Sequence, residues 1–164
     1  AVTAPRKVFT QQVRRAVVFA EMGLLDIFRQ KRTPKAVPTE AMAIDLSGGA
    51  RVPVVGESYY QKALAAAAGP KQPGGVEVNI RAVLVREPDN PYDSNAIAVY
   101  VDGGGKVGHL SRADAVAYSG LLEACAADGS VGACEAVILG ADSTRDTQYC
   151  VLLHIQPPEW RPGG

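Results

Sequence analysis

Apolar and polar residues alternate in several short runs after residue 50, and this pattern predicts a protein built mainly from β-strands. In the longest run, residues 76–86, apolar side chains recur at every second position, with Glu77, Asn79 and Arg81 between them. Side chains at alternate positions of a strand share one face, so this run should have a buried face and a solvent face. Similar runs predict further strands at residues 51–55, 96–102, 106–110, 131–139 and 148–156.

Two stretches with helical spacing interrupt these strands, at residues 59–68 and 111–127. Each begins with a capping-box pattern. In this pattern a serine is followed, three residues later, by a side chain that can bond back to it. The pairs are Ser58 with Gln61 and Ser111 with Asp114. The predicted buried stripe of the second helix is Val116, Leu121, Leu122 and Cys125. The order strand, helix, three strands, helix, two strands predicts a mainly β fold with two helices, as a small curved sheet or barrel.

Residues 1–50 do not share this pattern and are expected to form a separate arm. Two of its segments, 33–38 and 47–49, have the proline and glycine content of linkers. Between residues 8 and 32 a weak helical pattern ends in basic side chains, which suit a helix C-terminus. Such a helix would either dock on a partner or a membrane surface, or stay solvated on the arm. We therefore expect a basic arm (1–50), a barrel domain (51–157) and an irregular tail (158–164), with Met22 as an alternative start.

Charge is distributed unevenly, although the formal net charge of the 164 residues is +0. Residues 1–51 hold nine Lys and Arg against four Asp and Glu, a net of +5. Residues 52–157 hold seven basic against twelve acidic side chains, a net of −5. Binding of a long phosphate backbone depends on many Lys and Arg contacts, so an acidic domain is a poor platform for it. Any nucleic acid should touch the domain locally, or with help from the basic arm.

The sequence gives no sign of a membrane span, a signal peptide or a disulfide framework. No apolar run approaches the ~20 residues of a membrane span. The apolar run at residues 16–20 is also too short for a signal peptide. The cysteines Cys125, Cys134 and Cys150 are odd in number and form no CxxC pair, which argues against disulfides and a zinc site. We expect a cytoplasmic protein with no metal and no cofactor.

The chain offers the side chains of a catalytic site without the expected arrangement. Ser58, Asp93, His109 and His154 supply the residue types of a Ser-His-Asp site. The sequence after Ser58 lacks the closing glycine of a nucleophile elbow, and both histidines lie in predicted strands among apolar residues. No Walker-type phosphate-binding loop is present either. We therefore expect no catalytic activity from the chain itself.

One polar segment, residues 87–96, separates two predicted strands and holds most of the candidate chemistry. Pro88 and Pro91 fix φ and lack amide donors, so neither strand can continue through the segment. Several of its side chains can fold back onto nearby amides, as in Asx turns: Asp89, Asn90, Asp93 and Asn95. A stiff loop is expected, which would hold the Tyr92 ring and the Asp93 carboxylate in fixed directions.

Three segments together resemble the HIRAN domain, a family found alone in bacteria and phages and fused to Swi2/Snf2-type helicases in eukaryotes. They are residues 54–60 (Val-Val-Gly-Glu-Ser-Tyr-Tyr), 87–99 (Glu-Pro-Asp-Asn-Pro-Tyr-Asp-Ser-Asn-Ala-Ile-Ala-Val) and 107–112 (Val-Gly-His-Leu-Ser-Arg). The resemblance covers about residues 51–156 and says nothing about residues 1–50. It implies a modified oligonucleotide-binding (OB-like) barrel that grips the 3′ end of single-stranded DNA.

The resemblance also implies roles for individual residues. Tyr59 and Tyr92 would stack on the terminal bases, and Asp93 would accept a hydrogen bond from the 3′-hydroxyl. Further contacts, with phosphates and with another base, would come from Asn90, the amides near Tyr60, Arg112 and Tyr149. A carboxylate at this place would also repel a phosphorylated end or a continuing strand. The implied role is in DNA repair or replication, with a helicase or nuclease in trans as a candidate partner.

An alternative is a protein-interaction module that has lost DNA binding and docks through its basic N-terminal helix. The acidic domain favours this alternative, and so does Ser58, where DNA-binding relatives can carry a basic residue. Tyr59 and the Tyr92–Asp93 pair oppose it. Salt separates the two, because DNA binding weakens as salt rises whereas docking of an apolar helix is less sensitive.

Overall fold

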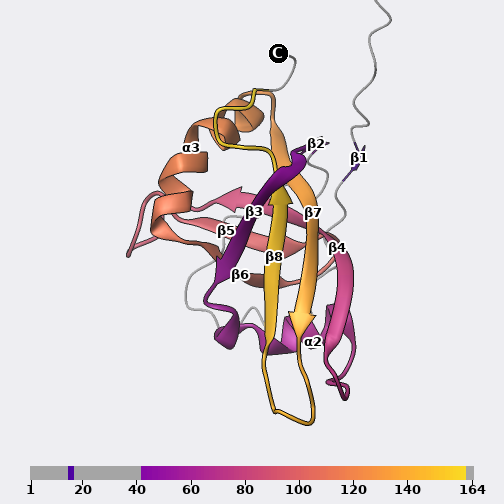
Figure 1. Cartoon of the computed structure of the whole chain (residues 1–164). Coiled ribbons are helices and arrows are strands. Elements are labelled where there is room, and N and C mark those ends of the chain that lie inside the picture. Colours follow the sequence, from indigo (N-terminus) through magenta and orange to yellow (C-terminus); the bar gives the residue numbers. More distant parts are fainter. Residues whose placement is uncertain (1–14, 17–41, 162–164) are drawn as a thin grey trace, which may run out of the picture.

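Six strands close into a small barrel in the computed structural model, which describes residues 15–16 and 42–161 (Figure 1). Neighbouring barrel strands pair antiparallel in the order β7-β4-β5-β6-β3-β8, and β8 pairs back with β7. Their bounds are β3 (Ser47–Val55), β4 (Val76–Arg86), β5 (Ile97–Val101), β6 (Lys106–Leu110), β7 (Ser130–Gly140) and β8 (Tyr149–Ile155). The predicted fold class, a mainly β, OB-like barrel with two helices, is confirmed.

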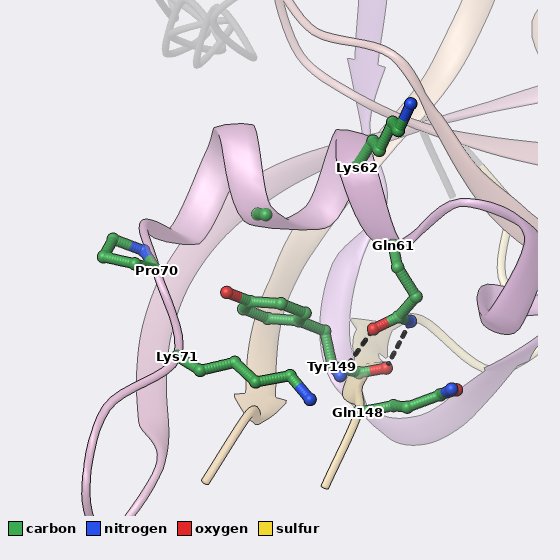
Figure 2. Close-up of a pocket in the computed structure, with 7 residues that line it drawn as sticks. Gln61, Lys62, Pro70, Lys71, Gln148 and Tyr149 are labelled. Carbon is green, nitrogen blue, oxygen red and sulfur yellow. Dashed lines mark hydrogen bonds between the residues drawn. The ribbon is translucent and has the colours of Figure 1, made fainter. Parts of the chain in front are cut away.

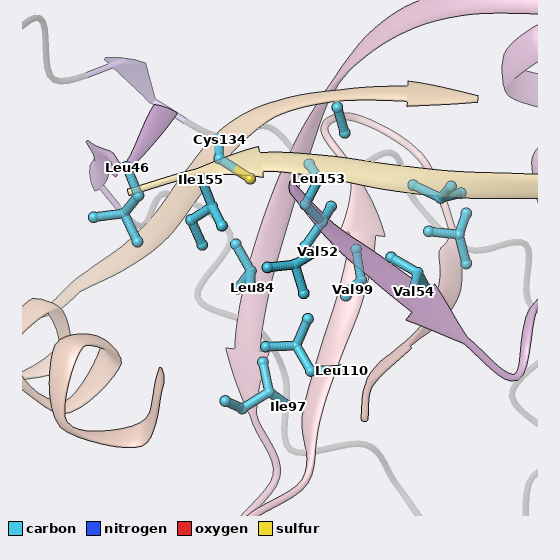
Figure 3. Close-up of a cluster of buried hydrophobic side chains, with 14 of the residues drawn as sticks. Leu46, Val52, Val54, Leu84, Ile97, Val99, Leu110, Cys134, Leu153 and Ile155 are labelled. Atoms are coloured by element: carbon cyan, nitrogen blue, oxygen red, sulfur yellow. The ribbon is translucent and has the colours of Figure 1, made fainter. Parts of the chain in front are cut away.

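The interior of the barrel is one hydrophobic core to which every barrel strand contributes (Figure 3). The central side chains that are buried there are Val52, Val54, Leu84, Ile97, Val99, Leu110, Cys134, Leu153 and Ile155. Each fully buried Val, Leu or Ile contributes about 1.5–3 kcal/mol to stability. Cys134 belongs to this core, and burial raises the pKa of its thiol to about 12.

The helix α3 (Arg112–Ala127) covers one end of the barrel and begins with the predicted capping box (Figure 1). The Asp114 amide donates to Ser111 Oγ at 3.1 Å, and Ser111 Oγ donates to Asp114 Oδ2 at 2.6 Å. Its buried residues are Ala115, Tyr118, Leu121, Leu122 and Cys125. The prediction that Val116 is buried is wrong, because the inward face runs through Ala115 and Tyr118 and leaves Val116 60% exposed.

The helix α2 (Gln61–Ala68) lies at the opposite end of the barrel and buries Leu64 (Figure 1). It ends at Gly69, as predicted, but its predicted cap by Ser58 is wrong. A short 3₁₀ turn, η1 (Glu57–Tyr59), precedes the helix, and Tyr60 occupies the N-cap without a side-chain hydrogen bond. Gln61 consequently turns its side chain elsewhere, to the Glu57 carbonyl and the Tyr149 backbone.

The sheet extends further toward the N-terminus than the sequence predicts. The strand β2 (Met42–Asp45) pairs parallel with the start of β7, and β1 (Arg15–Ala16) pairs antiparallel with β2. The assignment of residues 47–49 to a linker is wrong, since they begin β3. A Cβ at Gly48 would lie 2.7 Å from the Gln156 backbone, so this glycine permits a close approach of two chain segments.

Most of the predicted N-terminal helix, between residues 8 and 32, lies outside the described residues. Its residues 15–16 are described and form the strand β1 rather than helix. Near the C-terminus, residues 156–161 form no helix or strand, as expected of an irregular tail. Among the described residues, no helix has both the length and the apolar character needed to cross a membrane.

Candidate nucleic-acid interface

The 87–96 loop joins β4 to β5 and is closed by hydrogen bonds between its own backbone groups. The Glu87 amide donates to the Ala96 carbonyl at 2.8 Å, at the point where the loop leaves the sheet. The Asn90 amide donates to the Glu87 carbonyl at 2.9 Å, and the Ala96 amide to the Asp93 carbonyl at 3.0 Å. Two successive tight turns therefore fix the course of the loop.

Two side chains of the loop act as the sequence predicts and fold back onto backbone amides. Asn90 Oδ1 accepts from the amides of Tyr92 at 3.0 Å and Asp93 at 3.3 Å. Asp93 Oδ1 accepts from the Asn95 amide at 2.9 Å. With the described residues, the side chains of Asp89 and Asn95 make no hydrogen bond. The side-chain amide of Asn90 thus helps to hold the loop, and its expected phosphate contact stays a prediction.

Beneath the loop, the Glu87 carboxylate binds three neighbouring side chains. Lys106 Nζ donates to Oε1 at 2.7 Å, while His109 Nε2 at 3.0 Å and Asn90 Nδ2 at 3.1 Å share Oε2. An ionised carboxylate only accepts hydrogen bonds, so His109 carries a hydrogen on Nε2. These bonds, that from His109 foremost, lower the pKa of Glu87 to about 2 against the opposing effect of burial. Glu87 is therefore a half-buried anion that joins the loop to β6.

A β-bulge places Lys106 and His109, both partners of Glu87, on the same face of β6. Side chains three positions apart in a regular strand point to opposite faces. Val99 pairs with Gly108 but the next residue, Tyr100, pairs with Lys106, so the register shifts by one residue. This shift brings Lys106 and His109 to the outer face together, as a bulge re-aims side chains. Gly108 permits it, since a Cβ there would lie 2.4 Å from Val54 Cγ1.

Tyr60 packs against the same two side chains from the other side. Its ring centroid lies 6.4 Å from that of His109, and Lys106 Nζ lies 6.0 Å from the Tyr60 centroid. Tyr59, the residue before it in the chain, is 87% exposed. Tyr60 is thus the packed member of the pair. The 3₁₀ turn and the 87–96 loop therefore meet on Lys106 and His109.

A helix that began at residue 59, as the sequence predicts, would leave the amides of Tyr59 and Tyr60 unpaired in its first turn, but in the structure both are bonded. The Tyr59 amide donates to the Gly56 carbonyl at 3.1 Å, and the Tyr60 amide to the Glu57 carbonyl at 2.9 Å. The 3₁₀ turn consumes these donors before α2 begins. The unpaired amides of a helix N-terminus belong instead to the first turn of α2, from Gln61 onward.

Tyr92 and Asp93 stand at the tip of the loop, as the sequence predicts. Tyr92 is 88% exposed, which is unusual for so large an apolar ring. Asp93 is half-buried, and its Oδ2 lies 4.0 Å from Arg112 Nε at the start of α3. Arg112 itself is exposed. Loop and helix thus bring together an exposed aromatic ring, a carboxylate and a guanidinium.

Tyr149 does not fit the role of a base-stacking residue. Its side chain is 4% exposed and belongs to the hydrophobic core, and its hydroxyl donates to the Gly69 carbonyl at 2.6 Å. Figure 2 shows its ring beneath α2 and the Gln61 side chain bonded to its backbone. With its ring covered in this way, Tyr149 packs α2 onto the barrel.

The residue types of a Ser-His-Asp site are present without the bonds of one. His109 binds Glu87 rather than Asp93, and His154 lies in β8, paired in register with Arg51 and Glu135. Among the described residues, no group of three or more His, Cys, Asp or Glu side chains is placed to hold a metal ion.

Sequence reasoning missed the structural parts of the interface, which are Glu87 and Lys106. Both lie in or beside segments that resemble the family, but a charged side chain is usually expected to be solvated. Gly108 gave a usable signal, because a glycine inside a short strand often marks a bulge. A bulge between Lys106 and His109 would have placed these two side chains together.

The comparisons with known proteins agree with this architecture. The family model of the HIRAN domain matches residues 47–153. Among curated proteins, the helicase-like transcription factor of Mus musculus is 42% identical over 81 residues, 48% of this chain and 7% of that protein. The protein of the same name from Homo sapiens is 41% identical over 75 residues, 44% of this chain and 6% of its own length. The chain therefore spans less than a tenth of these relatives.

Two solved structures are also similar. One is a protein from Lactobacillus plantarum, with a TM-score of 0.39, 22% identity and coverage of 65% of this chain and 91% of that one. The other is the HIRAN domain of human HLTF, with a TM-score of 0.38, 23% identity and coverage of 73% and 95%.

The fold and the match over residues 47–153 define a small β-barrel binding domain. This chain belongs to the HIRAN domain family. Membership in this family supports nucleic-acid binding, and the HIRAN domain itself is a binding module without catalytic activity.

Proposed function

We propose that this domain recognises the 3′ end of single-stranded DNA. The observation that carries the proposal is a pair of almost fully exposed tyrosine rings, one of which is next in the chain to a half-buried carboxylate. Tyr59 is 87% and Tyr92 88% exposed, and the segments that bear them meet on Lys106 and His109. Rings held at the surface in this way are available to bases, each of which has a π-face.

The two tyrosines supply affinity without sequence preference. Stacking on an aromatic side chain contributes about 1–3 kcal/mol per base. The Tyr92 ring is carried by a loop whose backbone is already fixed by the Asn90 and Asp93 side chains. Little ordering of the loop is then needed on binding, which favours affinity.

Asp93 supplies the preference for an end. Its Oδ1 is bonded to the Asn95 amide, which leaves Oδ2 to accept a hydrogen bond from a 3′-hydroxyl. A 3′-phosphate or a continuing strand would bring negative charge against this carboxylate. Arg112, 4.0 Å from Oδ2, is placed to contact the adjacent phosphodiester. The first-turn amides of α2 are the other donors for a terminal phosphate.

The charge balance of the domain agrees with end binding rather than with tracking along a strand. Lys106 is paired with Glu87 and Arg112 lies beside Asp93, so few cations of this site remain for phosphates. We propose DNA repair or replication as the process and the cytoplasm as the location. A helicase or nuclease acting in trans is the proposed partner, since the domain supplies recognition alone.

The test is fluorescence anisotropy with a short labelled single strand that ends in a 3′-hydroxyl or a 3′-phosphate. We expect the wild type to prefer the hydroxyl, and Asp93→Asn to lose this preference while keeping the acceptor for the Asn95 amide. Tyr92→Ala should weaken binding about tenfold or more, the equivalent of one stacked base. Asp89→Asn is the matched control, because Asp89 is exposed on the same loop.

Each alternative outcome has a distinct meaning. Equal binding of both ends would refute end recognition. Binding that disappears when residues 1–41 are removed would move the DNA contact to the basic arm. Absence of binding at low salt would favour the protein-interaction module, in which the exposed tyrosines contact a protein surface.

A further inference from the structure

The Glu87 side chain joins the 87–96 loop to β6, on which the Tyr59 segment packs, although it would not itself touch DNA. It binds Asn90, which holds the amides of Tyr92 and Asp93. It also binds Lys106 and His109, on which Tyr60 packs beside Tyr59. No other residue of the described structure bonds both to the loop and to these two side chains of β6.

We propose that Glu87 is a positioning residue, which sets the place of the Tyr92–Asp93 tip relative to the Tyr59 segment and thereby determines the preference for a 3′-hydroxyl. This inference rests on the proposed function. It adds the residue that holds the Tyr92–Asp93 tip and the Tyr59 segment in their relative positions. Through the Asn90 amide, Glu87 orients the tip of the loop. Through the two β6 side chains, it locates that tip against the 3₁₀ turn.

The carboxylate is suited to this role because it is half-buried and accepts bonds from three side chains of the loop and β6. Both oxygens are used, Oε1 by Lys106 and Oε2 by Asn90 and His109. Bonds to an ionised acceptor are about twice as strong as those between neutral groups. The bulge at Gly108 is required as well, because without it Lys106 and His109 would lie on opposite faces of β6.

The same bonds restrain the lysine and the histidine of the site. Lys106 and His109, held by Glu87, are kept from forming alternative contacts with a phosphorylated end. Loss of the carboxylate would therefore loosen the loop and release positive charge together. Both effects reduce discrimination between a 3′-hydroxyl and a 3′-phosphate.

The test compares the wild type with Glu87→Gln, which keeps the shape of the side chain and removes its charge. We expect an about tenfold weaker affinity for the 3′-hydroxyl strand, as for the loss of a charge-assisted network. The ratio of affinities for the two ends should fall in parallel. Loss of folded protein lowers both affinities by one factor and leaves their ratio unchanged, so this ratio separates positioning from a general structural role.

Glu77→Gln is the matched control, because Glu77 is an exposed glutamate of β4, the strand that leads into Glu87. A double variant, Glu87→Gln with Tyr92→Ala, should lose less affinity than the two single variants combined, since Glu87 acts in part through the Tyr92 ring. Additive losses would overturn the proposal.

Hydrogen exchange of the free protein gives a readout that does not depend on DNA. In Glu87→Gln the amides of Tyr92 and Asp93 should exchange faster, while those of the β7–β8 pair stay protected. Unchanged exchange in the loop, or an unchanged ratio between the two ends in a variant that still binds, would overturn the role of Glu87 alone. A wild type that shows no preference between ends would overturn the proposed function together with this inference.

Discussion

Replacement of Glu87 by glutamine should reduce stability by an amount that depends on pH. The folded pKa of Glu87 is about 2, against an ordinary value of 4.5. Because the folded pKa is the lower one, the stabilisation is complete above about pH 5 and is lost as pH falls from 4.5 toward 2. Each pKa unit corresponds to ~1.36 kcal/mol, so the carboxylate contributes about 3 kcal/mol at neutral pH.

This value is retained without a large discount for solvent screening, because the Glu87 side chain is only 25% exposed. Glutamine resembles the protonated carboxyl group in shape. The difference in unfolding free energy between wild type and Glu87→Gln should therefore be about 3 kcal/mol at pH 7 and about 1.5 kcal/mol at pH 3. The unfolding free energies of the wild type and Glu87→Gln should thus converge as the pH is lowered.

Urea unfolding, followed by circular dichroism and by fluorescence of the single tryptophan, measures this difference. Trp160 packs against the hydrophobic core and reports its loss. Glu77→Gln should stay within about 0.5 kcal/mol of the wild type at each pH, as is usual for surface substitutions. A difference that is the same at pH 7 and pH 3, or smaller than about 1 kcal/mol at pH 7, would refute the reasoning.

Three further substitutions or probes test other parts of the structure. Tyr149→Phe should cost about 1 kcal/mol of stability in urea unfolding, through loss of the bond to the Gly69 carbonyl, and leave DNA affinity unchanged; weaker DNA binding at equal stability would return Tyr149 to the interface. Gly108→Ala should cost about 1–3 kcal/mol, because its Cβ would meet Val54, and an unchanged midpoint of unfolding would contradict the bulge geometry. Of the three cysteines, only the exposed Cys150 should react with a thiol reagent in the folded protein. Reaction of more than one thiol per chain before unfolding would show that the core is not closed.

Local patterns in the sequence predicted those parts of the fold that depend on local physics. The bounds of β4 follow from alternation between a glycine turn and a proline, and α3 begins at its capping box. The stiffness of the loop followed from the Asx-type side chains of Asn90 and Asp93. In each case the residues that determine the structure are neighbours in the chain.

The predictions that failed depend on contacts between distant segments. Gly48 reads as part of a linker, because glycine serves both flexible segments and close approaches, and only Gln156 decides between them. Tyr149 alternates correctly in its strand, but the Gly69 carbonyl and α2 determine that its ring is covered. The role of Glu87 likewise depends on a bulge in β6, about twenty residues away in the chain.

The closure of the barrel has a consequence for the order in which the protein folds. The first barrel strand, β3, pairs with the last, β8, and β8 also completes β7. Pairings across nearly the whole domain carry a large loop-closure entropy and slow the folding of β proteins. During synthesis, Tyr59 and Tyr92 leave the ribosome long before Tyr149–Ile155 can complete the sheet that supports them. The interface should therefore become functional only after the last strand has been made, as a late and cooperative event.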